Sequence, residues 1–171
     1  MKYAITGHTH GIGLALSKKV DFIGFSRSNG YDISTQHGLD NIIKDSQDCD
    51  VFVNNAYSEN YQTDLLYKLF NVWSHKKKTI INIGSNTTDG IKTYPHIYSA
   101  HKASLEKASE QLANLGTPCR VCLVKFGWVG TKRVLNNFKL DSYINVDDAA
   151  QYIIDCANFK YRLSTITILP N

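Results

Sequence analysis

Short apolar runs alternate with helical patterns along the whole chain, and this alternation constrains the fold more than any other feature. Runs typical of buried strands cover residues 2–6, 22–25, 49–53, 79–84, 120–124 and 164–169. Apolar residues spaced by three and four predict helices between them, at 14–19, 39–44, 62–74, 98–115 and after Asn145. Strands that alternate with helices form a parallel sheet with both faces covered. The sequence therefore predicts an α/β fold with a doubly wound parallel sheet, in a single domain over residues 1–171.

The composition is that of a globular protein, with 43% hydrophobic and 20% charged residues. The net charge of +4 is mild, and the basic run from His75 to Lys78 is more typical of a solvated turn than of a nucleic-acid surface. No apolar stretch approaches the ~18 residues of a membrane span. The apolar pair Ala4 and Ile5 lies close to Met1, which leaves no room for a signal peptide. We therefore expect a cytoplasmic protein that binds neither nucleic acid nor membrane.

The cysteines and histidines do not form a recognisable metal site. Cys119 and Cys122 are spaced as a ligand pair, but they lack a second pair and lie at or within an expected strand. His8 and His10 have no third ligand nearby in the sequence. We therefore expect packing roles for the two cysteines and no bound metal.

A glycine-rich turn follows the first expected strand and leads directly into a helix. It runs from Thr6 to Gly13, with glycines at positions 7, 11 and 13. Such a turn lets backbone N–H groups approach the pyrophosphate of a dinucleotide at the start of a helix. The spacing differs from the more common Gly-x-Gly-x-x-Gly, and a plain strand–turn–helix connection is the alternative.

The end of the second expected strand indicates which dinucleotide is bound. In dinucleotide folds an acidic residue at this point binds a free ribose 2′-hydroxyl, whereas an arginine suits a 2′-phosphate. Here the segment Ser26–Ser28 has Arg27 at its centre and no carboxylate, and His10 offers a further donor. Asp32 and Ile33 are expected to form a very short strand beside the adenine. The sequence therefore predicts NADP(H) rather than NAD(H).

Ser85, Tyr98 and Lys102 form the candidate catalytic set. Tyr98 follows the strand-end Ser85 by thirteen residues, and Lys102 follows four later, on the same face of a helix. An ammonium ~4 Å from a phenolate favours it by about 4 kcal/mol at an effective dielectric of ~20, so Lys102 is expected to lower the pKa of Tyr98. The serine hydroxyl would hold a carbonyl oxygen while the tyrosine protonates it. Because the chain has 10 tyrosines, a Tyr-x-x-x-Lys match also arises by chance, and a packed tyrosine beside a solvated lysine is the alternative.

With these residues placed, the chain resembles the short-chain dehydrogenase/reductase family over nearly its whole length. The turn Thr6–Gly13 resembles the family's coenzyme loop, and Asn54–Ala56 resembles the start of its Asn-Asn-Ala-Gly motif. The Ser–Tyr–Lys set matches the family's catalytic residues in type and spacing. Phe126–Gly127 stands where the family has Pro-Gly, and Val129 and Thr131 match positions that contact the nicotinamide.

The resemblance implies a Rossmann fold and an NADP(H)-dependent oxidoreductase that interconverts a carbonyl compound and an alcohol by hydride transfer. Tyr98 would be the general acid/base, Lys102 would lower its pKa and hold the nicotinamide ribose, and Ser85 would bind the reacting oxygen. The residues expected to contact the dinucleotide are Gly7, His8, Thr9, His10, Gly11, Ile12, Gly13, Ser26, Arg27, Ser28, Asp32, Ile33, Asn55, Ala56, Tyr57, Tyr98, Lys102, Gly127, Val129 and Thr131.

Several departures from the family pattern leave a second hypothesis open. The family's catalytic asparagine is not clearly placed, and Asn60 is the best candidate. Tyr57 replaces the glycine of the Asn-Asn-Ala-Gly motif and Phe126 replaces the proline, which adds bulk near the cofactor. The chain is also short for the family. These features are compatible with a dinucleotide-binding sensor that has little or no catalysis.

Two kinds of partner are expected. One is a small carbonyl or alcohol substrate, whose identity the sequence does not give. The other is a second copy of the chain, in a homodimer or homotetramer, because two helices carry apolar residues on more than one face. The family resemblance points to the same two helices. The apolar residues concerned are Leu65, Tyr67, Leu69, Phe70, Trp73, Leu105, Ala108 and Leu112.

Overall fold

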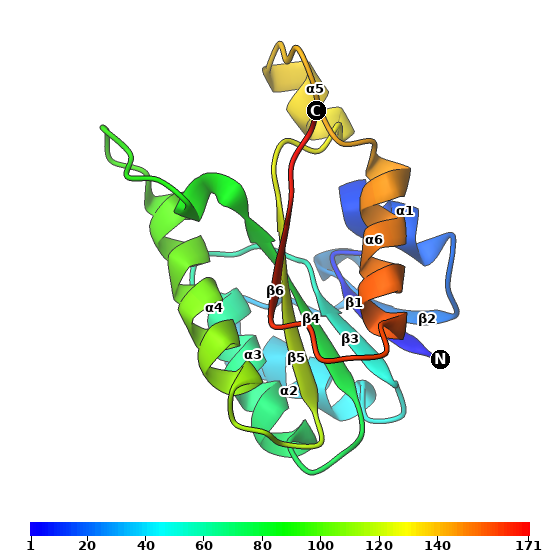
Figure 1. The fold of residues 1–171 in the computed structure, drawn as a ribbon. Helices are drawn as coiled ribbons and strands as arrows, with labels where there is room; N and C mark the ends of the chain where they lie inside the picture. The colour runs from blue at the N-terminus through cyan, green and yellow to red at the C-terminus, as the bar shows by residue number, and fades with distance from the viewer.

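The chain forms one sheet of six parallel strands in the order β2-β1-β3-β4-β5-β6, in a computed structural model that describes all 171 residues (Figure 1). The strands are β1 (Tyr3–Thr6), β2 (Phe22–Phe25), β3 (Val51–Asn54), β4 (Thr79–Ser85), β5 (Arg120–Phe126) and β6 (Thr165–Ile168). β4 and β5 pair over their whole length, from Thr79 opposite Arg120 to Ser85 opposite Phe126. The predicted doubly wound parallel sheet is confirmed.

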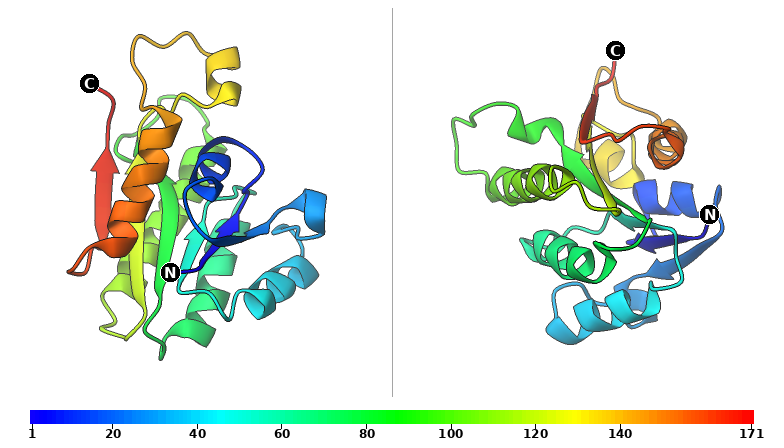
Figure 2. Two further views of the ribbon diagram at one scale, coloured as in Figure 1. Left: turned by 90° about the vertical axis from the view of Figure 1, so that its right-hand side faces the viewer. Right: turned by 60° about the horizontal axis from the view of Figure 1, so that its bottom comes forward.

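Helices cover both faces of this sheet (Figure 2). The helices on one face are α1 (Gly11–Ser17) and α6 (Val146–Asn158), and those on the other are α2 (Gln36–Asp45), α3 (Tyr61–Trp73) and α4 (Ile97–Ala113). The short α5 (Lys132–Asn137) lies beyond the carboxyl ends of the strands, at the top of Figure 1. Two 3-10 turns follow strand ends, η1 (Arg27–Asn29) after β2 and η2 (Asn86–Thr88) after β4. None of the helices combines the length and apolar character that a membrane crossing requires.

The direction of winding reverses between β1 and β3. From β1 the chain moves outward to β2 at one edge, then returns to β3 on the other side of β1 and continues to β6. In open parallel sheets ligands bind outside the carboxyl ends of the strands at such a reversal. The topology therefore directs attention to the residues just after β1, β3 and β4.

Two apolar cores lie on the two faces of the sheet. The core under α2, α3 and α4 has 19 buried residues, among them Phe52 and Trp73. The core under α1 and α6 has 18, among them Val53 and Ile153. Because successive residues of a strand point to opposite faces, Phe52 and Val53 enter different cores. This burial on both faces is why the strands read as continuous apolar runs.

Cys119 and Cys122 separate onto the two faces of the sheet. Cys119 belongs to the core under α2, α3 and α4, and Cys122 belongs to the core under α1 and α6. Burial raises the pKa of Cys119 to about 11. The two thiols therefore pack on opposite sides of the sheet and cannot share a metal ion.

The helix residues that suggested an oligomer interface are mostly buried within the chain itself. Of the eight, only Tyr67 is exposed, at 39%, and its Oη donates a hydrogen bond to Gln111 Oε1 at 2.7 Å. The other seven are between 0% and 5% exposed, because α3 and α4 pack against both the sheet and each other. The two helices leave no surplus apolar face of the expected size, and the homodimer or homotetramer stays a prediction based on the family resemblance.

The short strand expected at Asp32 and Ile33 is absent, so that prediction was wrong. The Asp32 carboxylate accepts hydrogen bonds from the backbone N–H and the hydroxyl of Ser34, at 2.9 and 2.7 Å, which closes a turn. Thr35 then caps α2, with its Oγ1 accepting from the Gly38 N–H at 3.0 Å. Ile33 packs into the core as a buried turn residue, and β2 is left as the edge strand.

Candidate active site

The glycine turn after β1 is packed too closely to accept side chains. A Cβ at Gly13 would lie 2.3 Å from the carbonyl oxygen of Gly7, and one at Gly7 would lie 3.1 Å from Asn55 Nδ2. Gly7 and Gly11 also have φ angles of +70° and +53°, in the left-handed region that favours glycine. The turn therefore presents bare backbone at the carboxyl end of β1, and a phosphate-bearing group fits such a cradle.

The histidines of this turn point in different directions. The His8 ring lies over β2, where a Cβ at Gly24 would be 2.4 Å from it, and its Nδ1 is buried without a hydrogen-bond partner. His10 is exposed at the start of α1, with its Nδ1 2.9 Å from Thr9 Oγ1. Ile12 packs against the core under α1 and α6. Of these residues, His10 and Thr9 face outward, so their side chains are accessible to a ligand.

Asn55 and Ala56 join the end of β3 to the glycine turn. Asn55 Nδ2 donates to the Thr6 carbonyl at 3.0 Å and to the Gly7 carbonyl at 3.4 Å. The backbone N–H groups of Asn55 and Ala56 both donate to Thr6 Oγ1, at 2.9 and 3.0 Å. These bonds fix the glycine turn to the sheet, which is a structural reason for the Asn-Asn-Ala motif.

Arg27 is unpaired at the carboxyl end of β2. Ser26 caps η1, with its backbone N–H donating to Asn29 Oδ1 at 2.8 Å and its hydroxyl 2.8 Å from that of Ser28. The Arg27 side chain is exposed, and no side-chain hydrogen bond or ion pair occupies it. The structure therefore leaves a free guanidinium beside two serines at the edge where the dinucleotide ribose was predicted.

Ser85 and Tyr98 meet at the carboxyl end of β4. Ser85 ends the strand, and its Oγ accepts the Thr87 N–H at 3.2 Å. Tyr98 lies in the first turn of α4, which Ser99 fixes to the same loop by donating to the Thr87 carbonyl at 2.9 Å. Burial raises the pKa of Tyr98, while a hydrogen bond with Ser85 and the charge of Arg133 act in the opposite direction. The Ser85 hydroxyl therefore lies close enough to the Tyr98 phenol to influence its pKa.

Lys102 is buried beside them and is held by two neutral acceptors. Its Nζ donates to the Ile83 carbonyl at 2.7 Å and to Gln62 Oε1 at 2.8 Å, and lies 5.6 Å from the centre of the Tyr98 ring. The residue is 4% exposed, and this burial lowers the pKa of Lys102 to about 7. The expected lowering of the Tyr98 pKa by Lys102 is not found. At this depth the ammonium is itself disfavoured, and it is directed toward Ile83 and Gln62.

Gln62 is the site residue that the sequence did not reveal. It is 2% exposed at the start of α3, and its Nε2 donates to the Asn54 carbonyl at 2.6 Å while its Oε1 accepts from Lys102. Asn60, which was predicted to complete the catalytic set, is exposed and makes no side-chain hydrogen bond. The prediction of Asn60 is therefore not supported by the structure. In the sequence, a glutamine beside a helical apolar stripe cannot be recognised as a site residue. Its side chain is directed inward only by the packing of α3 against β3 and β4.

Tyr57 borders Tyr98, the tyrosine of the predicted catalytic set. Its ring is packed edge-on to that of Tyr98, with centroids 4.8 Å apart and an interplanar angle of 72°. Its Oη lies 2.9 Å from His101 Nδ1, so it connects the segment after β3 to α4. Tyr57 remains 41% exposed. The bulky side chain of Tyr57, which was predicted to lie near the cofactor, therefore forms one wall of the site beside Tyr98.

An ion network around the buried Lys125 holds the segment that follows Ser85. Lys125 on β5 has a side chain that is 5% exposed, and it pairs with Asp89 and, at 2.8 Å, with Glu106 Oε1. Glu106 also accepts a hydrogen bond from Thr88. Because Thr88 and Asp89 lie at the end of η2, the 3-10 turn that follows β4, this network fixes the segment next to Ser85. Neither Lys125 nor Glu106 was predicted as a site residue.

The segment after β5 leads from the sheet back to the glycine turn. At Gly127 a Cβ would lie 2.8 Å from the C-terminal segment, so a side chain has no room there. Val129 is buried and forms a bridge with Ile144. Thr131 caps α5, and a Cβ at Gly11 would lie 3.2 Å from its methyl group. The residues predicted to contact the nicotinamide therefore lie next to the predicted pyrophosphate cradle.

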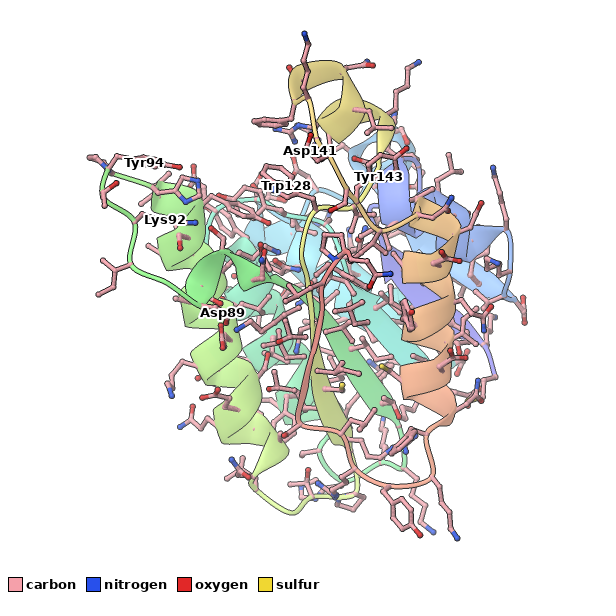
Figure 3. The ribbon with its side chains drawn as sticks, turned by 45° about the horizontal axis from the view of Figure 1, so that its top comes forward. Asp89, Lys92, Tyr94, Trp128, Asp141 and Tyr143 are labelled. Atoms are coloured by element: carbon pink, nitrogen blue, oxygen red, sulfur yellow. The ribbon has the colours of Figure 1, made fainter.

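Two projections flank this edge of the sheet (Figures 1 and 3). One is the loop before α4, where Figure 3 shows Lys92 and Tyr94, and the other is α5 with its flanking segments, near Trp128 and Tyr143. Tyr94, Trp128 and Tyr143 are 59%, 46% and 46% exposed. The site is therefore open and is bordered by exposed aromatic side chains.

No protein-family model matches the chain, and no curated protein matches it. Solved structures match its fold. A small-chain dehydrogenase in complex with NADPH gives a TM-score of 0.79 at 17% identity, over 99% of this chain and 95% of that chain. The closed form of a serine dehydrogenase complexed with NADP+ gives 0.78 at 15% identity, over 98% and 94%. A 4-hydroxyisoleucine dehydrogenase complexed with NADH gives 0.79 at 17% identity, over 98% and 96%.

The chain has the short-chain dehydrogenase fold. This confirms the fold that the family resemblance implied. In the structure the glycine turn follows β1, and Ser85 is the last residue of β4, at the same edge of the sheet. Identities of 15% to 17% carry the comparison no further than the fold. The chemistry must therefore be argued from the residues at this edge.

Proposed function

We propose that the protein is an NADP(H)-dependent oxidoreductase that interconverts a carbonyl compound and an alcohol. One observation carries the proposal: Ser85, Tyr98 and Lys102 lie together at the carboxyl end of β4, at the same edge of the sheet as the bare glycine turn after β1, with only β3 between the two strands. A purely structural tyrosine and lysine would not require a hydroxyl partner and a phosphate cradle at the same edge.

The cradle suits a dinucleotide. Side chains are excluded at Gly7 and Gly13, so backbone groups are accessible to a pyrophosphate. The unpaired Arg27, with Ser26 and Ser28 beside it, suits a ribose 2′-phosphate, because a guanidinium binds phosphate through two parallel hydrogen bonds. Structures of similar fold are complexed with NADPH or NADP+, and one with NADH, so Arg27 rather than the fold supports the choice of NADP(H).

In the proposed reaction, Tyr98 and Ser85 act on the oxygen of the substrate. The dinucleotide, when bound, supplies hydride to the carbonyl carbon or accepts it from the alcohol. The Ser85 hydroxyl holds the oxygen, and Tyr98 donates its phenolic proton to it in reduction and takes a proton back in oxidation. Burial raises the pKa of Tyr98, so the phenol stays protonated at neutral pH, which is the form that reduction requires.

Lys102 serves this pair from its buried position. When Lys102 is protonated, two of its three N–H donors bind Ile83 and Gln62, which leaves one for a ligand hydroxyl. Gln62 is in turn anchored on Asn54, so the lysine is held in one place. We propose Gln62 as the positioning residue that takes the role first assigned to Asn60.

A dinucleotide-binding sensor is the second candidate. It is favoured by the raised pKa of Tyr98 and by the neutral acceptors that hold Lys102, since neither feature makes the phenol a better acid/base at neutral pH. A sensor would bind NADPH without turning it over.

NADPH oxidation in the presence of a panel of aldehydes, ketones and quinones tests the proposal, with NADPH binding measured separately by fluorescence. The exposed aromatic border predicts that bulky aromatic carbonyl compounds are better substrates than small aliphatic ones. Ser85→Ala is expected to slow turnover on the best substrate without changing NADPH affinity. Tight binding with no oxidation by any compound would support the sensor, and the absence of NADPH binding would refute both candidates.

A further inference from the structure

A second cleft lies at the opposite end of the sheet from the candidate active site. It has a volume of about 560 Å³ and lies at the amino ends of β4 and β5, at the bottom of Figure 1. β4 runs from Thr79 in this cleft to Ser85 in the active site, and at ~3.3 Å per residue these ends are roughly 20 Å apart. A ligand in this cleft would therefore not touch the proposed cofactor or substrate.

Four cations line this cleft, and no acidic residue does. The basic side chains are Lys77, Lys78, Arg120 and Arg162, and the remaining wall is formed by threonines, glycine and proline. None of the four is among the ion pairs of the protein. The basic run that sequence analysis interpreted as a solvated turn thus lies beside two arginines that come from distant parts of the chain.

Neutral oxygens hold three of these cations in place without compensating their charge. Arg120 donates to Thr79 Oγ1 and to the Ala157 and Phe159 carbonyls, at distances of 2.9 to 3.2 Å. Lys78 donates to the Cys49 carbonyl at 2.6 Å and to the Gln47 carbonyl. Arg162 donates to the Thr117 carbonyl. Fixed and uncompensated positive charge of this kind is what an anion site requires.

Helix capping explains only part of the cluster. Arg120 binds carbonyls at the end of α6 and Lys78 binds carbonyls after α2, as cations near helix C-termini commonly do. Arg162 binds a loop carbonyl, and Lys77 is exposed with no partner at all. Burial lowers the pKa of Lys78, and the neighbouring Lys76 lowers it further, against smaller opposing effects of Cys49, Asp50 and Asp48.

We propose that this cleft binds a compact polyanion that carries two or more phosphoryl groups. Its volume is within the range of small-molecule sites, and arginine with lysine is the usual combination for phosphate. No aromatic side chain lines the cleft, Pro118 is its one apolar side chain, and Trp73, next to Lys78, is fully buried. A nucleobase or an RNA strand would therefore find no surface on which to stack.

Calorimetric titration of the full chain with inorganic tripolyphosphate tests the proposal. The test variant Lys77→Gln/Arg162→Gln removes two charges at exposed positions, and Lys92→Gln/Lys139→Gln removes two exposed charges at the other end of the molecule. We expect the dissociation constant to rise at least tenfold in the first double variant and to stay within twofold in the second. Arg162→Lys keeps the charge and is expected to retain most of the affinity.

Three results would overturn the proposal. The first is that tripolyphosphate does not bind to the parent protein. The second is that both double variants lose affinity equally. The third is that Lys77→Gln/Arg162→Gln leaves binding unchanged, which would place the polyanion at the glycine turn instead. A single-stranded oligonucleotide that binds more tightly than tripolyphosphate, in a manner abolished by the cleft variant, would overturn the compact ligand in favour of a nucleic acid. None of these outcomes depends on the oxidoreductase activity.

Discussion

Replacing the buried Lys102 by methionine should change how the stability of the protein depends on pH. The ammonium is 4% exposed, and its burial lowers the pKa from 10.5 to about 7. Below pH 7 the folded protein bears the cost of a buried charge. Between pH 7 and 10.5 the folded protein holds a neutral amine while the unfolded chain still binds a proton, so stability rises with pH. Lys102→Met removes this dependence, because methionine has no proton to release.

The size of the effect follows from the pKa. Each pH unit above the folded pKa contributes about 1.4 kcal/mol, so the parent should gain roughly 3 kcal/mol relative to Lys102→Met between pH 6 and pH 9. Urea unfolding followed by circular dichroism at several pH values measures this difference, in which all other titrating groups cancel. Lys107→Met is the matched control, since Lys107 lies on the same helix with a side chain 84% exposed. Parallel curves for the parent and Lys102→Met would refute the buried, proton-releasing lysine.

Three further predictions concern the cofactor cradle and the assembly. Arg27→Ala should weaken NADPH about 10- to 100-fold while leaving NADH nearly unchanged, because a charge-assisted contact to the 2′-phosphate is lost; fluorescence titration that shows equal losses, or tighter NADH binding by the parent, would contradict this. Gly13→Ala should lower Tm and weaken NADPH, since the new Cβ would lie 2.3 Å from the Gly7 carbonyl, whereas Gly90→Ala meets no atom within 4 Å and should behave as the parent does. Light scattering at micromolar concentration should give the mass of a dimer or tetramer, and a monomer mass would show that burial of α3 and α4 within the chain suffices.

Much of the fold could be predicted from the sequence because its four central strands, β1, β3, β4 and β5, are buried on both faces. Continuous apolar runs such as that of β4 have one interpretation when glycine turns and helical stripes separate them. The error at Asp32 had a local cause, since a carboxylate that accepts two hydrogen bonds from Ser34 replaces a strand by a turn. The helix face of α3 was misjudged for a different reason, because its burial depends on how α4 packs against it.

The candidate site was predictable where the chemistry is carried by motif spacing. Ser85 and Tyr98 are brought together as their spacing indicated. The spacing of residues in the sequence could not predict the surroundings of Lys102, because the depth at which Lys102 is buried is set by α3, β4 and α4 together. For the same reason the sequence did not predict Gln62, whose side-chain amide bridges Asn54 and Lys102. Nor did it predict the cationic cleft, because the residues of that cleft come from three separate segments of the chain.

Turnover by Tyr98→Phe tests the central claim most directly. The substitution keeps the ring that packs against Tyr57 and removes only the hydroxyl beside Ser85. Because general acid–base catalysis typically contributes about 10²- to 10⁴-fold, turnover on the best substrate should fall by that factor while NADPH affinity stays nearly unchanged. Tyr152→Phe, at an exposed position on α6, should leave both unchanged. If Tyr98→Phe reduces the substrate as fast as the parent does, Tyr98 is not the proton donor and the proposed mechanism is wrong.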